Sequence, residues 1–262
     1  MQGIIIATLT VGVIGLLIGT ALVAASEKFY VKVDEREASV RKHLPGNNCG
    51  ACGYAGCDAV AGAIVRQEVP VGICPIADAE AIAAMSEIMG VEVQQRSKKV
   101  GFIRCAGDCQ HTNKKGNYVG IRDCRAAFLT GLSLWDCDYG CLGLGSCADA
   151  CPQDAIRIEE GVARIDRERC AGCGICISAC PKNLIELVPV EQKIAVRCSS
   201  QWRGRTVRNV CSAGCIGCKL CEKECEHGAV KVEENIAHID YEKCTGCGKC
   251  AEKCPSQIIT EL

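Results

Sequence analysis

The cysteines of this chain fall in short regular runs, and one of these runs limits the possible folds more than any other feature. Residues 215–225 read CIGCKLCEKEC, with the spacing C-x2-C-x2-C-x3-C, and residues 244–254 repeat that spacing. Zinc sites usually use two separated C-x2-C pairs, whereas the compact run is typical of bacterial ferredoxins that bind [4Fe–4S] clusters. Since 25 of the 262 residues are cysteine, a secreted disulfide scaffold is the alternative, but the spacing predicts iron–sulfur ligation.

The two runs complete one another, because in a two-cluster ferredoxin the fourth cysteine of each run ligates the cluster of the other run. The segment between them predicts two short strands, over 229–232 and 236–240. We therefore expect a ferredoxin-like module with two ligand sets: Cys215, Cys218, Cys221 and Cys254 for one cluster, and Cys225, Cys244, Cys247 and Cys250 for the other.

An internal repeat predicts a second module of the same kind. A shift of 74 residues takes Cys244 back to Cys170, and EENIAHIDYEKCTGCGKCAEKCP then parallels EEGVARIDRERCAGCGICISACP. One cluster of this earlier module is expected to use four cysteines, namely Cys151, Cys170, Cys173 and Cys176.

The other cluster of the earlier module lacks one expected ligand, because Leu144 stands where the later module has Cys218. We expect Cys137 to take its place beside Cys141, Cys147 and Cys180. An incomplete cluster and a different ligand set are the alternatives.

A different cysteine pattern precedes both modules. The spacing C-x2-C-x4-C-x16-C places candidate ligands at Cys49, Cys52, Cys57 and Cys74, and alanine-rich helices are expected over 58–67 and 76–89. A zinc site and structural thiols are alternatives, but the compact glycine-flanked start favours a [4Fe–4S] cluster.

Five cysteines remain outside these sets: Cys105, Cys109, Cys124, Cys198 and Cys211. Cys105 and Cys198 each follow an arginine ahead of a module, as repeat equivalents would, and Cys211 is 74 residues beyond Cys137. Cys105, Cys109 and Cys124 are candidates to join a fourth thiolate in a sixth cluster. The alternative is that these cysteines are buried free thiols, which pack as small hydrophobes.

The N-terminal segment, residues 3–25, contains no charged residue and is long enough to cross a bilayer as a helix. A cleaved signal peptide competes with this interpretation, but no basic residue precedes the segment and the apolar run is long for one. Basic residues follow it, which predicts by the positive-inside rule that the rest of the chain is cytoplasmic. They are Lys28, Lys32, Arg36, Arg41 and Lys42.

We therefore predict an α+β chain in six segments. They are a transmembrane anchor (1–26), a four-cysteine [4Fe–4S] domain (27–92), a basic connector (93–136), ferredoxin-like module 1 (137–190), a basic linker (191–210) and ferredoxin-like module 2 (211–262). Dinucleotide, Walker and catalytic-triad motifs are lacking, so the chain itself is expected to carry electrons without a catalytic residue of its own. The scattered histidines are expected at the surface: His43, His111, His227 and His238.

Two stretches of the sequence are rich in basic residues. Solvated loops explain many such stretches, but a docking face for a small acidic electron carrier is the sharper hypothesis. A formal net charge of -1 and the lack of a binding motif argue against nucleic acid. The first stretch holds Arg96, Lys98, Lys99, Arg104, Lys114, Lys115, Arg122 and Arg125, and the second holds Lys193, Arg197, Arg203, Arg205 and Arg208.

The apolar helix, the motif LPGNNCGACGYAGC and the segment DCDYGCLGLGSCADACP together resemble the family of B subunits of the Rnf complex, over nearly the whole chain. The resemblance implies a subunit of a ferredoxin:NAD+ oxidoreductase in the cell (inner) membrane that couples electron transfer to Na+ or H+ translocation. It also implies that this subunit accepts electrons from reduced ferredoxin, and that flavin and NAD sites belong to the other Rnf subunits, its expected partners.

The runner-up is an iron–sulfur subunit of a carbon monoxide dehydrogenase/acetyl-CoA synthase-type enzyme, since the corrinoid protein of that system carries a similar four-cysteine domain. A soluble enzyme of that kind has no use for the N-terminal helix. At least five [4Fe–4S] clusters are expected in either case, and a sixth if the remaining thiols are ligands.

Overall fold

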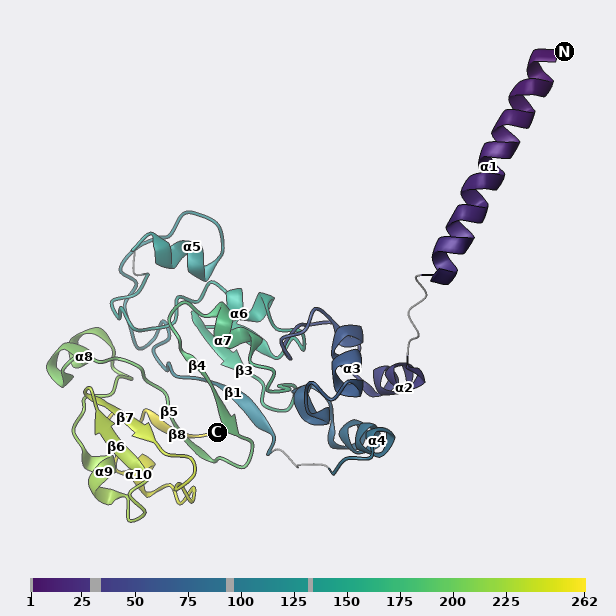
Figure 1. The fold of residues 1–262 in the computed structure, drawn as a ribbon. Coiled ribbons are helices and arrows are strands. Elements are labelled where there is room, and N and C mark those ends of the chain that lie inside the picture. The colour runs from purple at the N-terminus through teal and green to yellow at the C-terminus, as the bar shows by residue number, and fades with distance from the viewer. Residues whose placement is uncertain (1, 29–33, 93–96, 132–133) are drawn as a thin grey trace.

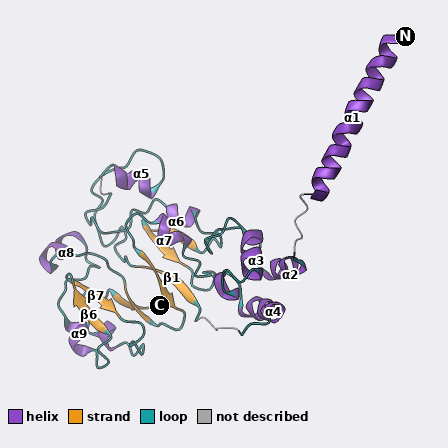
Figure 2. Cartoon of the chain, viewed as in Figure 1, coloured by secondary structure: helices purple, strands orange, loops and turns teal. Residues whose placement is uncertain are grey.

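The computed structural model describes residues 2–28, 34–92, 97–131 and 134–262 (Figure 1). Lys32 and Arg96, named above among the basic residues, lie outside these ranges. The described part of the chain consists of a long N-terminal helix, a small helical domain and two β-containing units (Figure 2).

Helix α1 (Gln2–Lys28) confirms the predicted apolar helix and extends it slightly at both ends. Its described side chains are exposed, including Val11 and Leu16, each with 70% of its surface accessible. The window Leu9–Ser26 has a mean hydropathy of 2.2, which is apolar enough to cross a membrane. A helix that is apolar all round needs a non-aqueous environment, so α1 is consistent with membrane anchoring.

The helical domain is built from α2 (Glu35–His43), α3 (Cys57–Val65), a 3-10 turn (Val71–Ile73) and α4 (Ala79–Met89). Its core contains Val40, Ile64 and Met85, which are almost fully buried. Both predicted helices are confirmed with shifted ends. Helix α4 begins later than expected because Asp78 is its N-cap and accepts a 2.7 Å hydrogen bond from the amide of Ala81.

The remaining part of the chain consists of two repeat units, each with two small antiparallel sheets. In the first unit, β2 (Ile156–Glu159) pairs with β3 (Val162–Ile165), and β1 (Lys99–Ile103) pairs with β4 (Ile185–Pro189). In the second, β6 (Val230–Glu233) pairs with β7 (Ile236–Ile239), and β5 (Ile194–Val196) pairs with β8 (Ile259–Glu261). The strands expected over 229–232 and 236–240 are thus confirmed to within one residue.

The sheets show that each repeat is longer than its ferredoxin motif. Strands β1 and β5 come from the segments predicted as connector and linker, yet each pairs with the last strand of the following module. We therefore call residues 97–190 the first repeat unit and residues 191–262 the second. Four short helices complete their cysteine motifs: α6 (Ser146–Asp149), α7 (Ile175–Ala179), α9 (Leu220–Glu224) and α10 (Lys249–Glu252).

Two further helices, α5 (Cys124–Leu129) and α8 (Gly204–Val210), lie in the long loops after β1 and β5. The interior of each unit mixes aliphatic side chains with cysteines. Cys105, Cys147 and Cys176 pack in the first core, and Cys198 and Cys215 in the second. A hydrogen bond of 2.6 Å from Tyr241 Oη to Glu186 Oε1 joins the second unit to the first.

Candidate iron–sulfur sites

Four cavities in the repeat units are each lined by four cysteines. Two of these sets match the sequence prediction: Cys215, Cys218, Cys221 and Cys254 in the second unit, and Cys151, Cys170, Cys173 and Cys176 in the first. The other two are Cys124, Cys141, Cys147 and Cys180, and Cys105, Cys137, Cys198 and Cys211.

The thiols surround these cavities and do not converge on one point. Within the described ranges, no three His, Cys, Asp or Glu side chains are placed to hold a single metal ion. A [4Fe–4S] cluster is held at separate iron corners by separate cysteines, so a ring of four thiols around a cavity suits a cluster better than it suits one zinc ion.

The local sequence explains how each ring forms. A C-x2-C loop needs tight turns, and Gly217 supplies one with φ of 65°, where a Cβ would lie 2.9 Å from the carbonyl oxygen of Asn235. The next cysteine then sits in a short helix, as Cys221 does in α9 and Cys176 does in α7. The fourth cysteine of the ring comes from the other end of the motif, as Cys254 does in the set of Cys221.

The structure places Cys137 apart from the set predicted for it. This residue was predicted to complete the set of Cys141, Cys147 and Cys180, but it lines the cavity of Cys105 instead. Cys124 lines the cavity of those three residues. It starts α5, and its thiol therefore comes from a loop that precedes the ferredoxin motif.

The other predicted set of the second unit is Cys225, Cys244, Cys247 and Cys250, and its members lie near one another around Cys250. Burial raises the pKa of Cys250 to about 11, and the nearby thiols of Cys244, Cys225 and Cys247 contribute. Gln192 Nε2 donates a 3.3 Å hydrogen bond to Cys244 Sγ. The four expected residues of this set are therefore neighbours.

The helical domain brings three of its four cysteines together. Cys57 begins α3, where its amide donates a 2.8 Å hydrogen bond to Asn48 Oδ1. Burial raises the pKa of Cys74, and the thiols of Cys52 and Cys57 add to the effect. The fourth member, Cys49, is close enough to Cys173 to contribute to the raised pKa of that thiol, which burial chiefly causes. The domain therefore places its cysteine loop beside the first repeat unit.

Several of these thiols are hard to ionise without a metal. Burial raises the pKa of Cys147, Cys176 and Cys221 to about 12. Iron binds the thiolate form, so ligand binding at these sites releases protons. Backbone amides also point at the sulfurs: Gly101 N–H donates to Cys170 Sγ at 3.3 Å and Ala155 N–H to Cys151 Sγ at 3.4 Å, contacts that tune the potential of iron–sulfur clusters.

Cys109 is exposed, lines none of the four cavities and belongs to none of the predicted four-cysteine sets. All four histidines are exposed, as predicted. In the first basic stretch, Arg104 lies 3.9 Å from Glu186, and Arg125 donates a hydrogen bond to the carbonyl of Ser178.

Other basic residues of that stretch are free of such contacts. Lys114, Lys115 and Arg122 are exposed, and none of them forms an ion pair with another described residue. They belong to the loop that leads into α5 and hence to Cys124.

Comparison with known proteins agrees with this geometry. Residues 44–76 match a family model for an Fe-S cluster domain, and residues 136–184, 214–258 and 169–230 match models described as "4Fe-4S dicluster domain". The chain therefore contains multiple [4Fe–4S] clusters.

Full-length relatives extend the comparison to almost every residue. The chain is 42% identical over 94% of its length to the B subunit of the "Ion-translocating oxidoreductase complex" of Methanosarcina acetivorans, of which it covers 94%. It is 41% identical over 99% of its length to the B subunit of the "Na(+)-translocating ferredoxin:NAD(+) oxidoreductase complex" of Acetobacterium woodii, covering 78% of that protein.

A third relative is the B subunit of the "Proton-translocating ferredoxin:NAD(+) oxidoreductase complex" of Clostridium ljungdahlii. It is 38% identical over the whole of this chain, which covers 94% of that protein. Cysteine-lined cavities, matching cluster domains and full-length relatives lead to one conclusion: this chain belongs to the family of iron–sulfur B subunits of Rnf-type ion-translocating ferredoxin:NAD+ oxidoreductases.

Proposed function

We propose that this chain accepts electrons from reduced ferredoxin and passes them, through a series of [4Fe–4S] clusters, to other subunits of an ion-translocating complex. The observation that carries the proposal is the series of four-cysteine rings around cavities. Clusters of this type carry one electron at a time. The residues that line the rings hold and insulate the clusters, and the chain contributes no substrate-converting residue.

Five ligand sets support at least five clusters. They are Cys49, Cys52, Cys57 and Cys74 in the helical domain; Cys151, Cys170, Cys173 and Cys176, and Cys124, Cys141, Cys147 and Cys180, in the first repeat unit; and Cys215, Cys218, Cys221 and Cys254, and Cys225, Cys244, Cys247 and Cys250, in the second.

The arrangement of the sets suits a relay. Cys49 of the helical domain neighbours Cys173 of the first unit, and within that unit Cys176 is close enough to Cys147 to contribute to the raised pKa of Cys147, which burial chiefly causes. Three sites therefore follow one another from the domain after the membrane helix into the body of the protein.

Reduced ferredoxin is the proposed electron donor because it is a small acidic protein and the loop before α5 is basic. Lys114, Lys115 and Arg122 are exposed and free to attract an acidic surface, which steers weak redox encounters. The relatives from A. woodii and C. ljungdahlii are named as ferredoxin:NAD(+) oxidoreductase subunits. One of those names specifies Na+ and the other protons, so either ion fits.

The proposed location is the cytoplasmic membrane, with α1 as a single span and the cysteine-bearing part on the cytoplasmic side. Lys28, Arg36, Arg41 and Lys42 follow the span, which favours this orientation. The other membrane and peripheral subunits of the complex are the proposed partners.

Anaerobic purification with iron counting and redox-titrated electron paramagnetic resonance tests the proposal. Five sets require about 20 iron atoms per chain, and mixing with reduced ferredoxin should reduce the bound clusters. A preparation with clearly fewer than about sixteen irons, or one dominated by zinc, would contradict the cluster assignment. Clusters that dithionite reduces but ferredoxin does not would contradict the assigned donor.

A further inference from the structure

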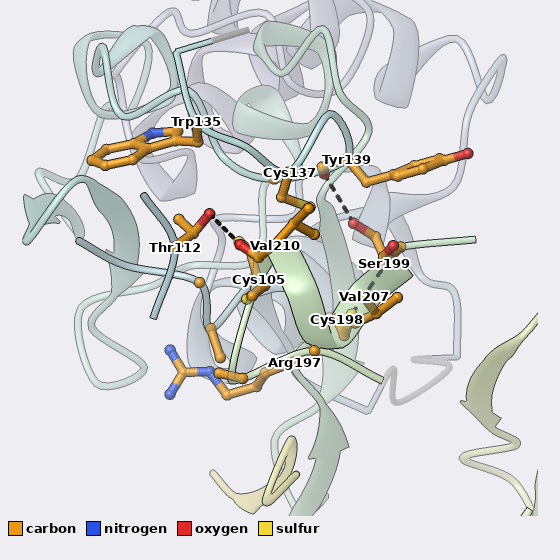
Figure 3. Close-up of a pocket in the computed structure, with 17 residues that line it drawn as sticks. Cys105, Thr112, Trp135, Cys137, Tyr139, Arg197, Cys198, Ser199, Val207 and Val210 are labelled. Atoms are coloured by element: carbon orange, nitrogen blue, oxygen red, sulfur yellow. Dashed lines mark hydrogen bonds between the residues drawn. The ribbon is translucent and has the colours of Figure 1, made fainter. Parts of the chain in front are cut away.

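A sixth ring of cysteines lies where the two repeat units meet. The first unit contributes Cys105 and Cys137, the second contributes Cys198 and Cys211, and all four line one cavity (Figure 3). Cys105, Cys198 and Cys211 are each at most 8% exposed. The spacing of these cysteines along the chain resembles no cluster motif, since the ring exists only when the two units are packed together.

The four thiols form two equivalent pairs. Cys137 and Cys211 occupy the same position of the repeat, 74 residues apart. Cys105 follows β1, and Cys198 follows β5, with one arginine before the cysteine in each case. Each repeat unit therefore presents the same two cysteines to the shared cavity.

The hydrogen bonds at the ring repeat in the same way. The amide of Cys141 donates to Cys105 Sγ at 3.5 Å, and the amide of Cys215 donates to Cys198 Sγ at 3.3 Å. Cys141 and Cys215 are themselves repeat equivalents and belong to the neighbouring cysteine sets of their units. The ring thus touches one site of the first unit on one side and one site of the second unit on the other.

Direct contacts between the units hold the ring closed. Ser199 Oγ donates to the carbonyl of Tyr139 at 3.2 Å, and Thr112 Oγ1 donates to the carbonyl of Val210 at 2.8 Å (Figure 3). The amide of Ser212 also donates to the carbonyl of His111 at 2.9 Å. These bonds fix Cys137 and Cys211 through the residues beside them.

A buried nitrogen atom without a hydrogen-bond partner suggests what belongs in the cavity. Arg197 lines the cavity, and its Nε is buried without a hydrogen-bond partner (Figure 3). A buried charged donor without a partner is costly. An anionic group in the cavity would compensate the guanidinium, and iron–sulfur clusters held by four thiolates are anionic.

We propose that Cys105, Cys137, Cys198 and Cys211 hold a sixth [4Fe–4S] cluster at the interface, with two ligands from each repeat unit. The group would supply one-electron chemistry between the sites of the two units, and Arg197 would set its potential. This inference extends the proposed relay across the whole chain. The role of this cluster in the relay rests on the proposed function, whereas the presence of iron at the site does not.

The first test removes one ligand from each unit in the full-length protein, with the substitutions Cys137→Ala and Cys198→Ala combined. The double variant should lose about four irons and one paramagnetic signal, while the other signals remain. Cys109→Ala, which removes the exposed cysteine outside the ring, is the matched control and should keep all its iron. A double variant with the full wild-type iron content overturns the inference.

The second test needs no ligand to be removed. Arg197→Gln should keep the iron content and lower the midpoint potential of one cluster, because a nearby positive charge stabilises the reduced, more negative state. Arg205→Gln, on exposed α8, should change no potential. If the double variant fails to fold, this measurement decides the question. The inference is overturned if every cluster of the Arg197→Gln variant keeps its wild-type midpoint potential.

The two proposals fail in different ways. Wild-type protein with about 24 irons that ferredoxin cannot reduce would remove the proposed donor and leave the interface site intact. Protein with about 20 irons that ferredoxin reduces normally would remove the interface site and leave the donor intact.

Discussion

The backbone amide of Cys124 donates a 2.6 Å hydrogen bond to the hydroxyl of Ser146. That hydroxyl in turn donates to Asp123 Oδ2 at 2.8 Å, and the same carboxylate caps α5 by accepting from the amide of Ala126. Ser146 immediately precedes Cys147 in α6. This small network therefore fastens the loop cysteine Cys124 to the helix that carries another member of its set.

Replacing Cys124 tests which residue completes this set. Cys124→Ala should lose one cluster, because the ring keeps only three thiols. Adding Leu144→Cys, which restores the cysteine position of module 2, should recover that cluster. Iron content and the redox-titrated paramagnetic spectrum measure both effects. If the single variant Cys124→Ala keeps its full iron content, Cys124 is not a ligand of this cluster and Cys137 is again the candidate for the fourth ligand.

Removing the Ser146 hydroxyl should weaken the same site without removing a ligand. Ser146→Ala leaves the Cys124 amide and one carboxylate oxygen of Asp123 without this partner, at a cost of about 1 kcal/mol. We expect normal initial iron but faster bleaching of one cluster in the presence of an iron chelator. Ser39→Ala removes an exposed hydrogen bond to the carbonyl of Glu35 in α2 and is the control. Equal bleaching rates in the two variants would show that the network does not hold the site.

The hydrogen bond between Tyr241 and Glu186 should stabilise the packing of the two repeat units. Tyr241→Phe removes a 2.6 Å bond, at a cost of about 1 kcal/mol, and amide hydrogen exchange in β4 should accelerate. Burial, with Glu186 as a second cause, raises the pKa of Tyr241 above its usual range. The stabilisation is therefore present below the unfolded pKa of about 10 and is lost only as pH rises through the higher folded pKa. Unchanged exchange in β4 would argue against this role.

The basic loop before α5 should control the encounter with ferredoxin. Reversing Lys114, Lys115 and Arg122 to glutamate should lower the second-order rate of reduction by ferredoxin, and rising salt should slow the wild type in the same way. Stopped-flow mixing at several ionic strengths measures both.

A matched reversal on the second unit uses the exposed residues Lys223, Lys231 and Lys253, and should have less effect while both variants keep their iron. Rates insensitive to salt and to the first reversal would exclude this loop as the docking face.

Deleting residues 1–28 should release the protein from the membrane, because α1 supplies the only candidate span in the described residues. The truncated chain should remain in the supernatant with its iron content unchanged, since α1 contributes no cysteine. Full-length protein should resist extraction by carbonate. Its release by carbonate, or a mature N-terminus near Ser26, would contradict the anchor.

The sequence predicts those parts of the fold that local patterns control. Cys215, Cys218 and Cys221 lie within seven residues, so their spacing alone defines a loop around one centre. The sequence does not place Cys124 with Cys141, Cys147 and Cys180, because an irregular loop brings it to α6 through Asp123 and Ser146. Cys105 and Cys198 were recognised as equivalents, but their shared cavity depends on the packing of two units, which no local pattern reports.

The pairing of equivalent cysteines at one cavity divides the ring between the two halves of the chain. Cys105 and Cys137 come from the first unit and Cys198 and Cys211 from the second, so neither unit by itself contains a complete ring. Because both halves lie in one chain, their sequences are free to differ around the shared cavity: Arg197 lines it, whereas its counterpart Arg104 lies 3.9 Å from Glu186.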